Sequence, residues 1–270
     1  MIPAGFSYHR ASTLDEALAL LTEHGDEAKL LAGGHSLLPL MKLRLSTPEV
    51  VIDLGPLDEL RYVRFSNGLV SIGALSRYHD LQHDPVLREN APLIAHAAGQ
   101  IGDPQVRHRG TIGGSLAHAD PAADLPAAVL AGDGELVVRG PSGTRTVPAA
   151  EFFLGPFTTS LEPDELLTEI RVPARPATGW GFEKFTRRAI DWAIVGVAAV
   201  GQSVALINMG GTPLRAHAVE SALASGASIA EAAGLAAENT NPADEPHASP
   251  GYRKHLARVL TARALTAATS

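Results

Sequence analysis

The sequence contains no cysteine, and this absence removes several classes of site. Without thiols the chain can form no disulfide bond, no zinc–thiolate site and no thiol nucleophile, and it cannot bind an iron–sulfur cluster through its own cysteines. The eleven histidines include no H-E-x-x-H or H-x-x-E-H pattern. We therefore expect no metal site in this chain.

Long apolar runs and strong positive charge are also missing. The longest apolar stretch, residues 192–207, is interrupted by Gln202 and Ser203, whereas a helix needs about 20 apolar residues to cross a bilayer. Residues 1–12 lack the charged and apolar segments of a signal peptide. The net charge of −7 with no long basic run argues against a nucleic-acid or anionic-membrane partner. We expect a cytoplasmic protein with no membrane span and no nucleic-acid partner.

The chain has enough apolar residues for a large core. It is 270 residues long, 45% hydrophobic and 19% charged, which suits one large domain or two small ones. Thr13 and Glu16 have the spacing of a capping box and Gly25 suits a helix end, so we predict a helix over 12–25. Further helices are predicted over 76–100, with a break at Asp84–Pro85, and over 120–132. Strands are predicted at 28–33, 49–54 and 69–75, and a hairpin at 134–149.

A Pro-rich connector follows a strand that begins near residue 164, and we place a domain boundary near 173–178. After it, the sequence predicts three strands and two Ala-rich helical segments. The strands are 181–187, 193–201 and 204–210, and the helical segments are 216–240 and 251–268. The pattern predicts an α+β N-terminal part of about 170 residues and a smaller C-terminal part with a sheet and helices.

Two glycine pairs stand out, in "AGGHS" at 32–36 and "TIGGS" at 111–115. Consecutive glycines permit positive φ and let backbone N–H groups converge on an anion. Hydroxyl groups of Ser36, Thr111 and Ser115 add donors, and a diphosphate suits such a site. Neither stretch is a Walker A or a G-x-G-x-x-G motif. Each pair alone is equally compatible with a tight turn, but two similar loops favour a dinucleotide clamp.

These stretches resemble a known family when they are read with their surroundings. The segments "LLAGGHSLLPLMKLRL", "VIDL" and "IGDPQVRHRGTIGGSLAHADPAADLPAAVLA" resemble the FAD-binding medium subunits of molybdenum hydroxylases, a group that includes aerobic carbon monoxide dehydrogenase and xanthine dehydrogenase. The resemblance covers essentially the whole chain. It implies a vanillyl-alcohol-oxidase (PCMH)-type FAD-binding domain over 1–174, with two α+β subdomains at about 1–56 and 57–174, and a carbon monoxide dehydrogenase flavoprotein C-terminal-type domain over 175–270.

The resemblance also implies which residues bind FAD. The two glycine loops would bind the diphosphate, and four further positions match family positions around the cofactor. The loop residues are Ala32, Gly33, Gly34, His35, Ser36, Thr111, Ile112, Gly113, Gly114 and Ser115, and the further positions are Asp124, Leu167, Lys184 and Trp192. Three of these have plainer interpretations: a helix N-terminal charge for Asp124, a solvated strand residue for Lys184 and a core residue for Trp192.

The mode of attachment is a separate prediction. Some flavoproteins of this fold attach FAD through histidine, which brings His35 and His118 into question. Members that resemble this chain hold FAD non-covalently, so we predict no covalent link.

The resemblance places the rest of the chemistry on partner subunits. It implies a large molybdopterin subunit and a small subunit with 2Fe–2S clusters, assembled as a dimer of heterotrimers. The FAD of this chain would pass electrons from those clusters to an external acceptor, and we expect no catalytic acid or base here. The absence of cysteine fits this division, because the clusters must then lie on another polypeptide.

Several functions stay open at the level of sequence. "AGGHSLLPLMKLRL" favours members like carbon monoxide dehydrogenase, but a medium subunit of a xanthine, nicotine or aromatic-heterocycle dehydrogenase has similar motifs. The glycine loops are also compatible with a stand-alone flavin oxidoreductase and with a nucleotide-binding scaffold that has no redox activity. The electron acceptor could be a quinone, NAD or oxygen.

Overall fold

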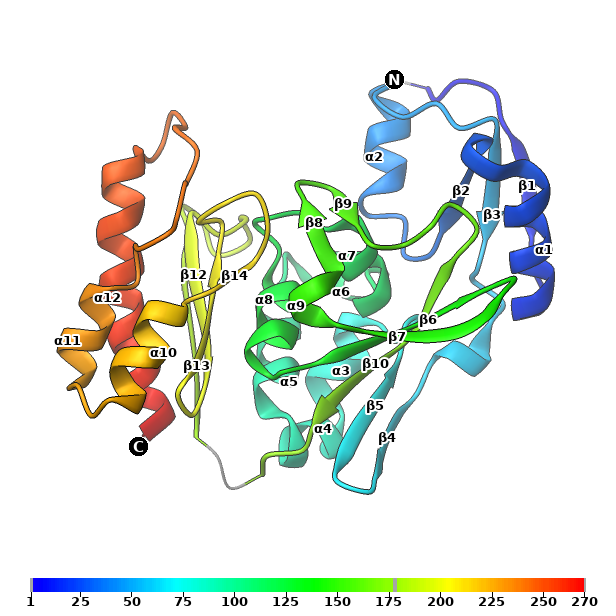
Figure 1. Cartoon of the computed structure of the whole chain (residues 1–270). Helices are drawn as coiled ribbons and strands as arrows, with labels where there is room; N and C mark the ends of the chain where they lie inside the picture. The colour runs from blue at the N-terminus through cyan, green and yellow to red at the C-terminus, as the bar shows by residue number, and fades with distance from the viewer. Residues whose placement is uncertain (1, 177–178, 270) are drawn as a thin grey trace.

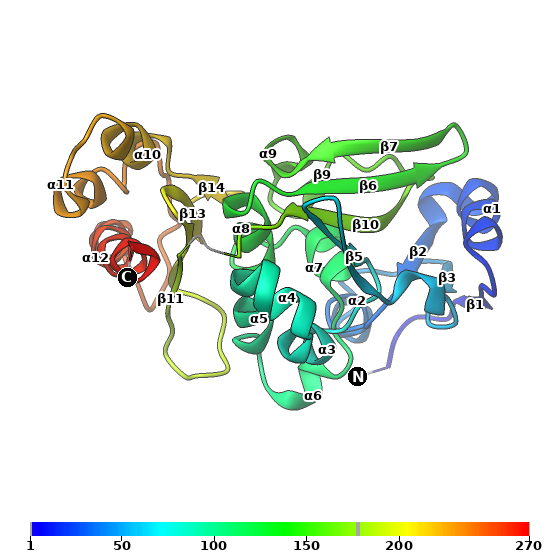
Figure 2. The same ribbon diagram turned by 90° about the horizontal axis from the view of Figure 1, so that it is seen from below.

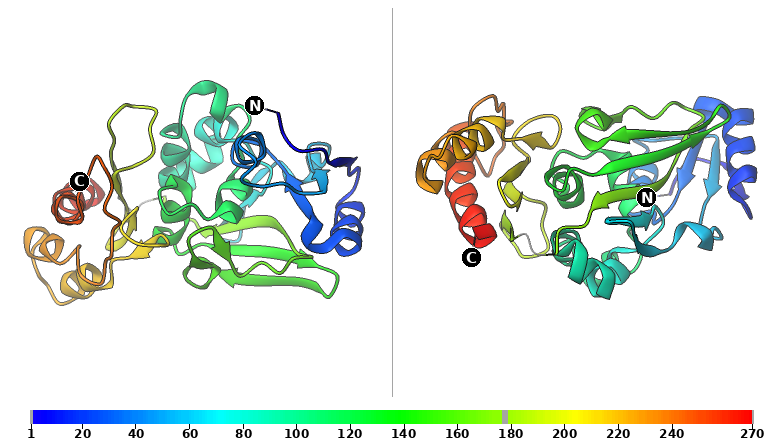
Figure 3. Two further views of the ribbon diagram at one scale, coloured as in Figure 1. Left: turned by 90° about the horizontal axis from the view of Figure 1, so that it is seen from above. Right: turned by 60° about the horizontal axis from the view of Figure 1, so that its bottom comes forward.

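The computed structural model describes residues 2–176 and 179–269 and shows three units in a row. Figure 1 shows the N-terminal unit in blue at one end, a larger unit in cyan and green in the middle, and the C-terminal unit in yellow to red at the other end. Figures 2 and 3 show the same order from other sides. The boundary expected near 173–178 includes residues 177 and 178, which lie outside the described residues.

The first unit is a parallel sheet with one long helix beside it. The strands are in the order β1 (Ser7–Arg10), β3 (Val50–Asp53), β2 (Ala28–Leu31). Helix α1 (Leu14–His24) begins after Thr13, whose side chain accepts the Glu16 N–H, and is followed by Gly25 at φ +49°. The predicted helix is therefore confirmed. Two short helices, η1 (Gly25–Glu27) and α2 (Leu37–Lys42), complete the unit.

The second unit is an antiparallel five-stranded sheet with helices packed on it. Its strand order is β4 (Val63–Ser66), β5 (Leu69–Gly73), β10 (Leu166–Pro173), β6 (Glu135–Gly140), β7 (Gly143–Pro148). The remaining elements are η2 (Asp58–Leu60), α3 (Tyr78–His83), α4 (Pro85–Asn90), α5 (Pro92–Gly99), α6 (Pro104–Arg107), α7 (Ile112–His118), α8 (Asp124–Ala131), α9 (Ala149–Phe152), β8 (Phe153–Gly155) and β9 (Thr158–Thr159).

Two helix predictions in this unit need comment. The break at Asp84–Pro85 is confirmed, and a second break falls at Ala91–Pro92, where another proline begins a helix. The prediction over 120–132 is wrong for its first four residues, because α8 begins only at Asp124. Instead, the Asp120 side chain accepts the Ala122 N–H at 2.8 Å and forms a local turn.

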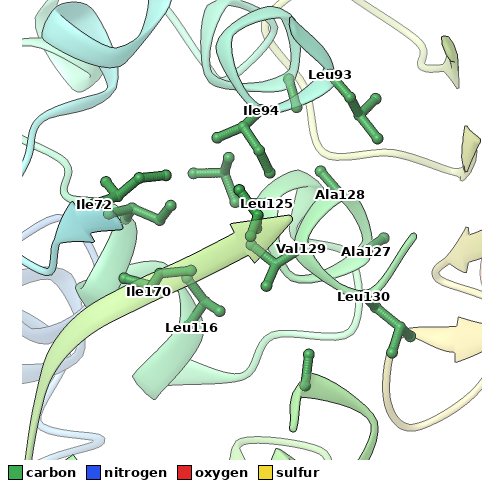
Figure 4. Close-up of a cluster of buried hydrophobic side chains, with 14 of the residues drawn as sticks. Ile72, Leu93, Ile94, Leu116, Leu125, Ala127, Ala128, Val129, Leu130 and Ile170 are labelled. Carbon is green, nitrogen blue, oxygen red and sulfur yellow. The ribbon is translucent and has the colours of Figure 1, made fainter. Parts of the chain in front are cut away.

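Helix α8 lies at the centre of the main core. Figure 4 shows Leu125 and Val129 of α8 near Ile72 and Ile170 of the sheet, with Leu116 of α7 beside them. Every residue of α8 is buried, because the helix packs both on its own unit and on strands β12 (Val195–Val200) and β13 (Ser203–Ile207) of the next. After its first residue, Asp124, the helix is apolar on all sides, which suits a position between two sheets.

The third unit is an antiparallel sheet covered on both faces. Its order is β11 (Trp180–Phe185), β12 (Val195–Val200), β13 (Ser203–Ile207), β14 (Leu214–Arg215), followed by α10 (His217–Ala224), α11 (Ile229–Gly234) and α12 (Pro250–Thr269). Helix α12 packs on β11 and β12, and α5 and α8 pack on the opposite face. The predicted helix over 216–240 is interrupted, because Gly226 takes φ +86° and Ser228 begins α11 with a capping box.

None of the helices in the described part of the chain is long and apolar enough to cross a membrane.

Candidate functional site: two glycine loops and a buried ion pair

The first glycine loop, residues 32–36, connects β2 to α2 and lies directly against the chain that leads into the second loop. Gly34 has φ +80°, which favours glycine at that position. A Cβ atom at Gly33 would lie 2.3 Å from the Arg109 carbonyl oxygen and 2.9 Å from Gly110 Cα. Only a glycine allows the two main chains to approach this closely.

The second glycine loop begins helix α7 and is held by its own hydrogen bonds. Thr111 precedes the helix, and its Oγ1 accepts the Gly114 N–H at 3.2 Å. The Ile112 N–H donates to the Ser76 carbonyl and the Gly113 N–H to the Ala74 carbonyl at 2.8 Å. A Cβ at Gly114 would lie 3.9 Å from Ala32 Cβ. The structure thus brings the two loops together, as the sequence predicts for one site.

The two loops differ in which of their backbone N–H groups remain free to donate a hydrogen bond. Within the described residues, the backbone N–H groups of Gly33, Gly34, His35 and Ser36 donate no hydrogen bond. The N–H groups of Ile112, Gly113 and Gly114 all donate hydrogen bonds within the protein. The first loop can therefore supply amide donors to an anion, whereas the second supplies shape and the Thr111 hydroxyl.

Asp124 and Lys184 form a buried ion pair near these loops. Lys184 Nζ on β11 lies 2.7 Å from Asp124 Oδ2 at the start of α8, with side chains 8% and 3% exposed. The ammonium group also donates to the Gln100 carbonyl at 3.1 Å. The solvated-strand interpretation of Lys184 is therefore wrong. Asp124 Oδ1 is buried and has no hydrogen-bond partner among the described residues, so this site holds an acceptor without a donor.

Burial controls the ionisation of Asp124. Removal from water raises the pKa of its carboxyl group to about 6, and the nearby Lys184 ammonium opposes this rise. The group therefore titrates close to neutral pH, which is where perturbed carboxyl groups of functional sites are often found.

Tyr78 is part of this region, although sequence reasoning missed it. Its N–H donates to the Gly110 carbonyl at 3.0 Å, and its ring would lie 2.3 Å from a Cβ at Gly110. Its buried hydroxyl bonds to Ser115, and burial raises the pKa of Tyr78 to about 12. A tyrosine at the start of a helix resembles an ordinary core residue, so no sequence signal marks this position.

Leu167 and Trp192 lie in different settings. Leu167 is 6% exposed and packs in the main core, beside an irregularity in the pairing of β10 with β6. Trp192 is 58% exposed, in the connection between β11 and β12, so its interpretation as a core residue is wrong. It lines an open cleft of about 610 Å³ together with Phe157.

This cleft lies near the end of α7 opposite the glycine loops. The ring of His118, the last residue of α7, lies 5.1 Å from that of Phe157, which lines the cleft. At about 1.5 Å per residue, the seven residues of α7 span about 10 Å. The glycine loops and the cleft thus lie near the two ends of one short helix. His35, by contrast, is exposed in the first loop.

Comparisons with known proteins cover the same regions. Residues 4–175 match the family described as "FAD binding domain in molybdopterin dehydrogenase", and residues 180–268 match "CO dehydrogenase flavoprotein C-terminal domain". The carbon monoxide dehydrogenase medium chain of Hydrogenophaga pseudoflava is 44% identical over 99% of this chain and 98% of that protein. The glyceraldehyde dehydrogenase medium chain of Sulfolobus acidocaldarius is 39% identical over 98% of each.

A solved structure extends the likeness to three dimensions. The structure of carbon monoxide dehydrogenase from Hydrogenophaga pseudoflava that lacks the Mo-pyranopterin moiety contains a chain with a TM-score of 0.96 and 45% identity. The match covers 100% of this chain and 99% of that one.

Proposed function

The chain belongs to the family of FAD-binding subunits of molybdopterin dehydrogenases, and from this premise we propose that it is the medium subunit of a carbon monoxide dehydrogenase-type complex. In that complex it passes electrons from iron–sulfur clusters to an external acceptor. The observation that supports this most directly is the pair of glycine loops in contact at Gly33 and Arg109, with unbonded amides at Gly33–Ser36.

The residues present suit FAD. Bound FAD supplies the redox chemistry, because its ring accepts and gives up electrons. The free N–H groups of the first loop and the hydroxyl of Thr111 would hold the diphosphate, because the glycines carry no side chain that would block it. Asp124 Oδ1, which has no hydrogen-bond donor in the described chain, would accept a hydrogen bond from a hydroxyl group of the cofactor.

Lys184, Leu167 and Trp192 complete the proposed contacts around the flavin. Lys184 brings a buried positive charge, which would stabilise negative charge on the flavin ring. Leu167 supplies an apolar surface, and Trp192 presents an exposed aromatic side chain in the cleft. Attachment is non-covalent, and no residue of this chain acts as a catalytic acid or base.

The partners follow from what the chain lacks. A chain with no cysteine receives electrons from clusters on another polypeptide, here a small 2Fe–2S subunit that is supplied by a large molybdopterin subunit. We propose a dimer of such heterotrimers in the cytoplasm. Carbon monoxide is the favoured substrate because the carbon monoxide dehydrogenase medium chain of Hydrogenophaga pseudoflava is more similar to this chain, at 44% identity, than the glyceraldehyde dehydrogenase medium chain, at 39%.

Spectroscopy of the assembled complex tests the proposal. The chain is purified with its molybdenum and iron–sulfur partners, and its flavin absorbance band is followed under carbon monoxide, glyceraldehyde and xanthine. We expect bleaching with carbon monoxide in the complex and none with the FAD-supplied chain alone. Bleaching with another substrate only would reassign the substrate. Bleaching of the chain alone would show a stand-alone enzyme, and the absence of flavin from the complex would favour a scaffold.

A further inference from the structure

Arg253, in the first turn of α12, is the largest of the fully buried side chains in the described residues. Its Nη1 donates to the carbonyl groups of Ile194 at 3.0 Å and Asn208 at 3.2 Å. Its Nε donates to the Ala248 carbonyl at 3.4 Å, and Nη2 pairs with Glu245. One guanidinium therefore connects the chain at residues 194, 208 and 245–248 to the start of α12.

The segments that Arg253 connects form one side of the cleft. Ile194, Asn208 and Glu245 all line it, together with Trp192. Ile194 closes the connection between β11 and β12, because its N–H donates to the Phe185 carbonyl at 2.8 Å. Arg253 thus lies buried behind the residues that line the cleft and bonds to their main-chain carbonyl groups.

Asn208 in turn donates hydrogen bonds to two further segments. Its Nδ2 donates to the carbonyl of Ala193, the neighbour of Trp192, at 2.8 Å. Its N–H donates to the Pro121 carbonyl, in the turn between α7 and α8, at 2.9 Å. Asn208 adopts φ +60°, which is uncommon for a residue with a side chain. The connection bearing Trp192 is therefore fixed to the FAD-binding part of the chain.

The burial of this charge has a consequence for its role. Burying a guanidinium is costly, and an apolar side chain of similar volume often stabilises a fold as well or better. A buried arginine that bonds carbonyl groups of several segments instead fixes one arrangement of them, since the planar guanidinium sets both direction and distance.

We propose that Arg253 is a positioning residue, which acts through Ile194 and Asn208 to hold Trp192 in the cleft. The inference rests on the proposed function only in its last step, the contact of Trp192 with the flavin. Arg253 itself is fully buried and is not among the described residues that line the cleft.

Local motion of Trp192 tests the positioning role in the full chain. Trp180→Phe leaves Trp192 as the only tryptophan, and its nanosecond mobility is read from time-resolved fluorescence anisotropy. We expect Arg253→Met to increase the amplitude of the fast decay about twofold. The control is Arg258→Met, which changes an exposed arginine of the same helix that donates to the Gly234 carbonyl; it should leave the decay unchanged.

Arg253→Lys covers the case in which Arg253→Met does not fold. Lysine keeps the charge but has a single nitrogen, so we expect a smaller increase in the same direction. A folded Arg253 variant with wild-type anisotropy would overturn the proposal.

A double-mutant cycle on FAD affinity tests the last step separately. In the assembled complex, Arg253→Lys should weaken FAD binding about fivefold, and this effect should vanish in a Trp192→Ala background. Greater mobility of Trp192 with no such coupling would support the positioning role and contradict the proposed contact of Trp192 with the flavin.

Discussion

Gly33→Ala is the sharpest test of the paired loops. The new methyl group would lie 2.3 Å from the Arg109 carbonyl oxygen, and ordinary contact begins at 3.4 Å, so the loops must separate by about 1.1 Å (3.4 − 2.3). The Arg109 side of the contact is fixed, because the N–H groups of Arg109 and Gly110 both donate to the Val106 carbonyl. The first loop, with its unbonded amides, is therefore the one that moves.

The size of the effect follows from that displacement. Overpacking at a rigid contact costs about 1–3 kcal/mol, and each 1.4 kcal/mol corresponds to about a tenfold change in affinity. We assign about 2 kcal/mol of this cost to the free energy of FAD binding, and we therefore expect FAD affinity to fall about thirtyfold.

The measurement is titration of the FAD-free complex with FAD, followed by flavin fluorescence, together with thermal unfolding of each variant. Gly5→Ala is the control, because nothing lies within 4 Å of a Cβ there, and it should change neither quantity. Unchanged FAD affinity and unchanged stability in Gly33→Ala would refute the argument that this contact shapes the site.

Three further predictions concern attachment and pH. Acid precipitation of the complex should release all FAD into the supernatant, and colour retained in the pellet would return His35 and His118 to candidacy. Burial raises the pKa of Asp124 from 3.8 to about 6 in the folded state. The protonated carboxyl group therefore favours the folded state, and this stabilisation is fully present below pH 3.8 and is lost as pH rises through about 6. Asp124→Asn should therefore gain stability relative to wild type between about pH 4 and about pH 7, and a constant difference in Tm would contradict this. Asp133 is partly buried, but Arg215 and Arg175 outweigh that effect and lower its pKa. The stabilisation is present above the ordinary pKa and is lost as pH falls through the lowered one, so Asp133→Asn should unfold in acid with less dependence on pH.

The sequence predicted the family, the fold class and the FAD cofactor correctly, because these depend on local patterns and motifs. Helix α1 has its capping residues within the segment itself, and each glycine loop is a short continuous motif. The comparisons confirm the membership that those motifs implied. The roles of the individual site residues stay predictions.

Other features depend on packing between distant segments. Asp124 and Lys184 are 60 positions apart, and their burial is set by the way the third unit packs on the second. Packing also determines the hydrogen bonds of the second loop, where the N–H groups of Ile112 and Gly113 donate to the carbonyl groups of Ser76 and Ala74. Neither residue type nor spacing encodes such contacts, so the sequence could not distinguish the loop with free donors from the loop without them.

The alternation along strand β12 has a consequence for how this protein can be divided. Val195, Val197 and Ala199 belong to the core of the C-terminal unit, whereas Ala198 and Val200 belong to the main core around α8. A fragment beginning at residue 180 would expose the second set, with Ala205 and Ile207 of β13, to water. Such an apolar face promotes association. The two segments matched by separate family models therefore share one apolar core, and we expect a domain exchange between relatives to succeed only when α5 and α8 are carried together with the sheet they cover.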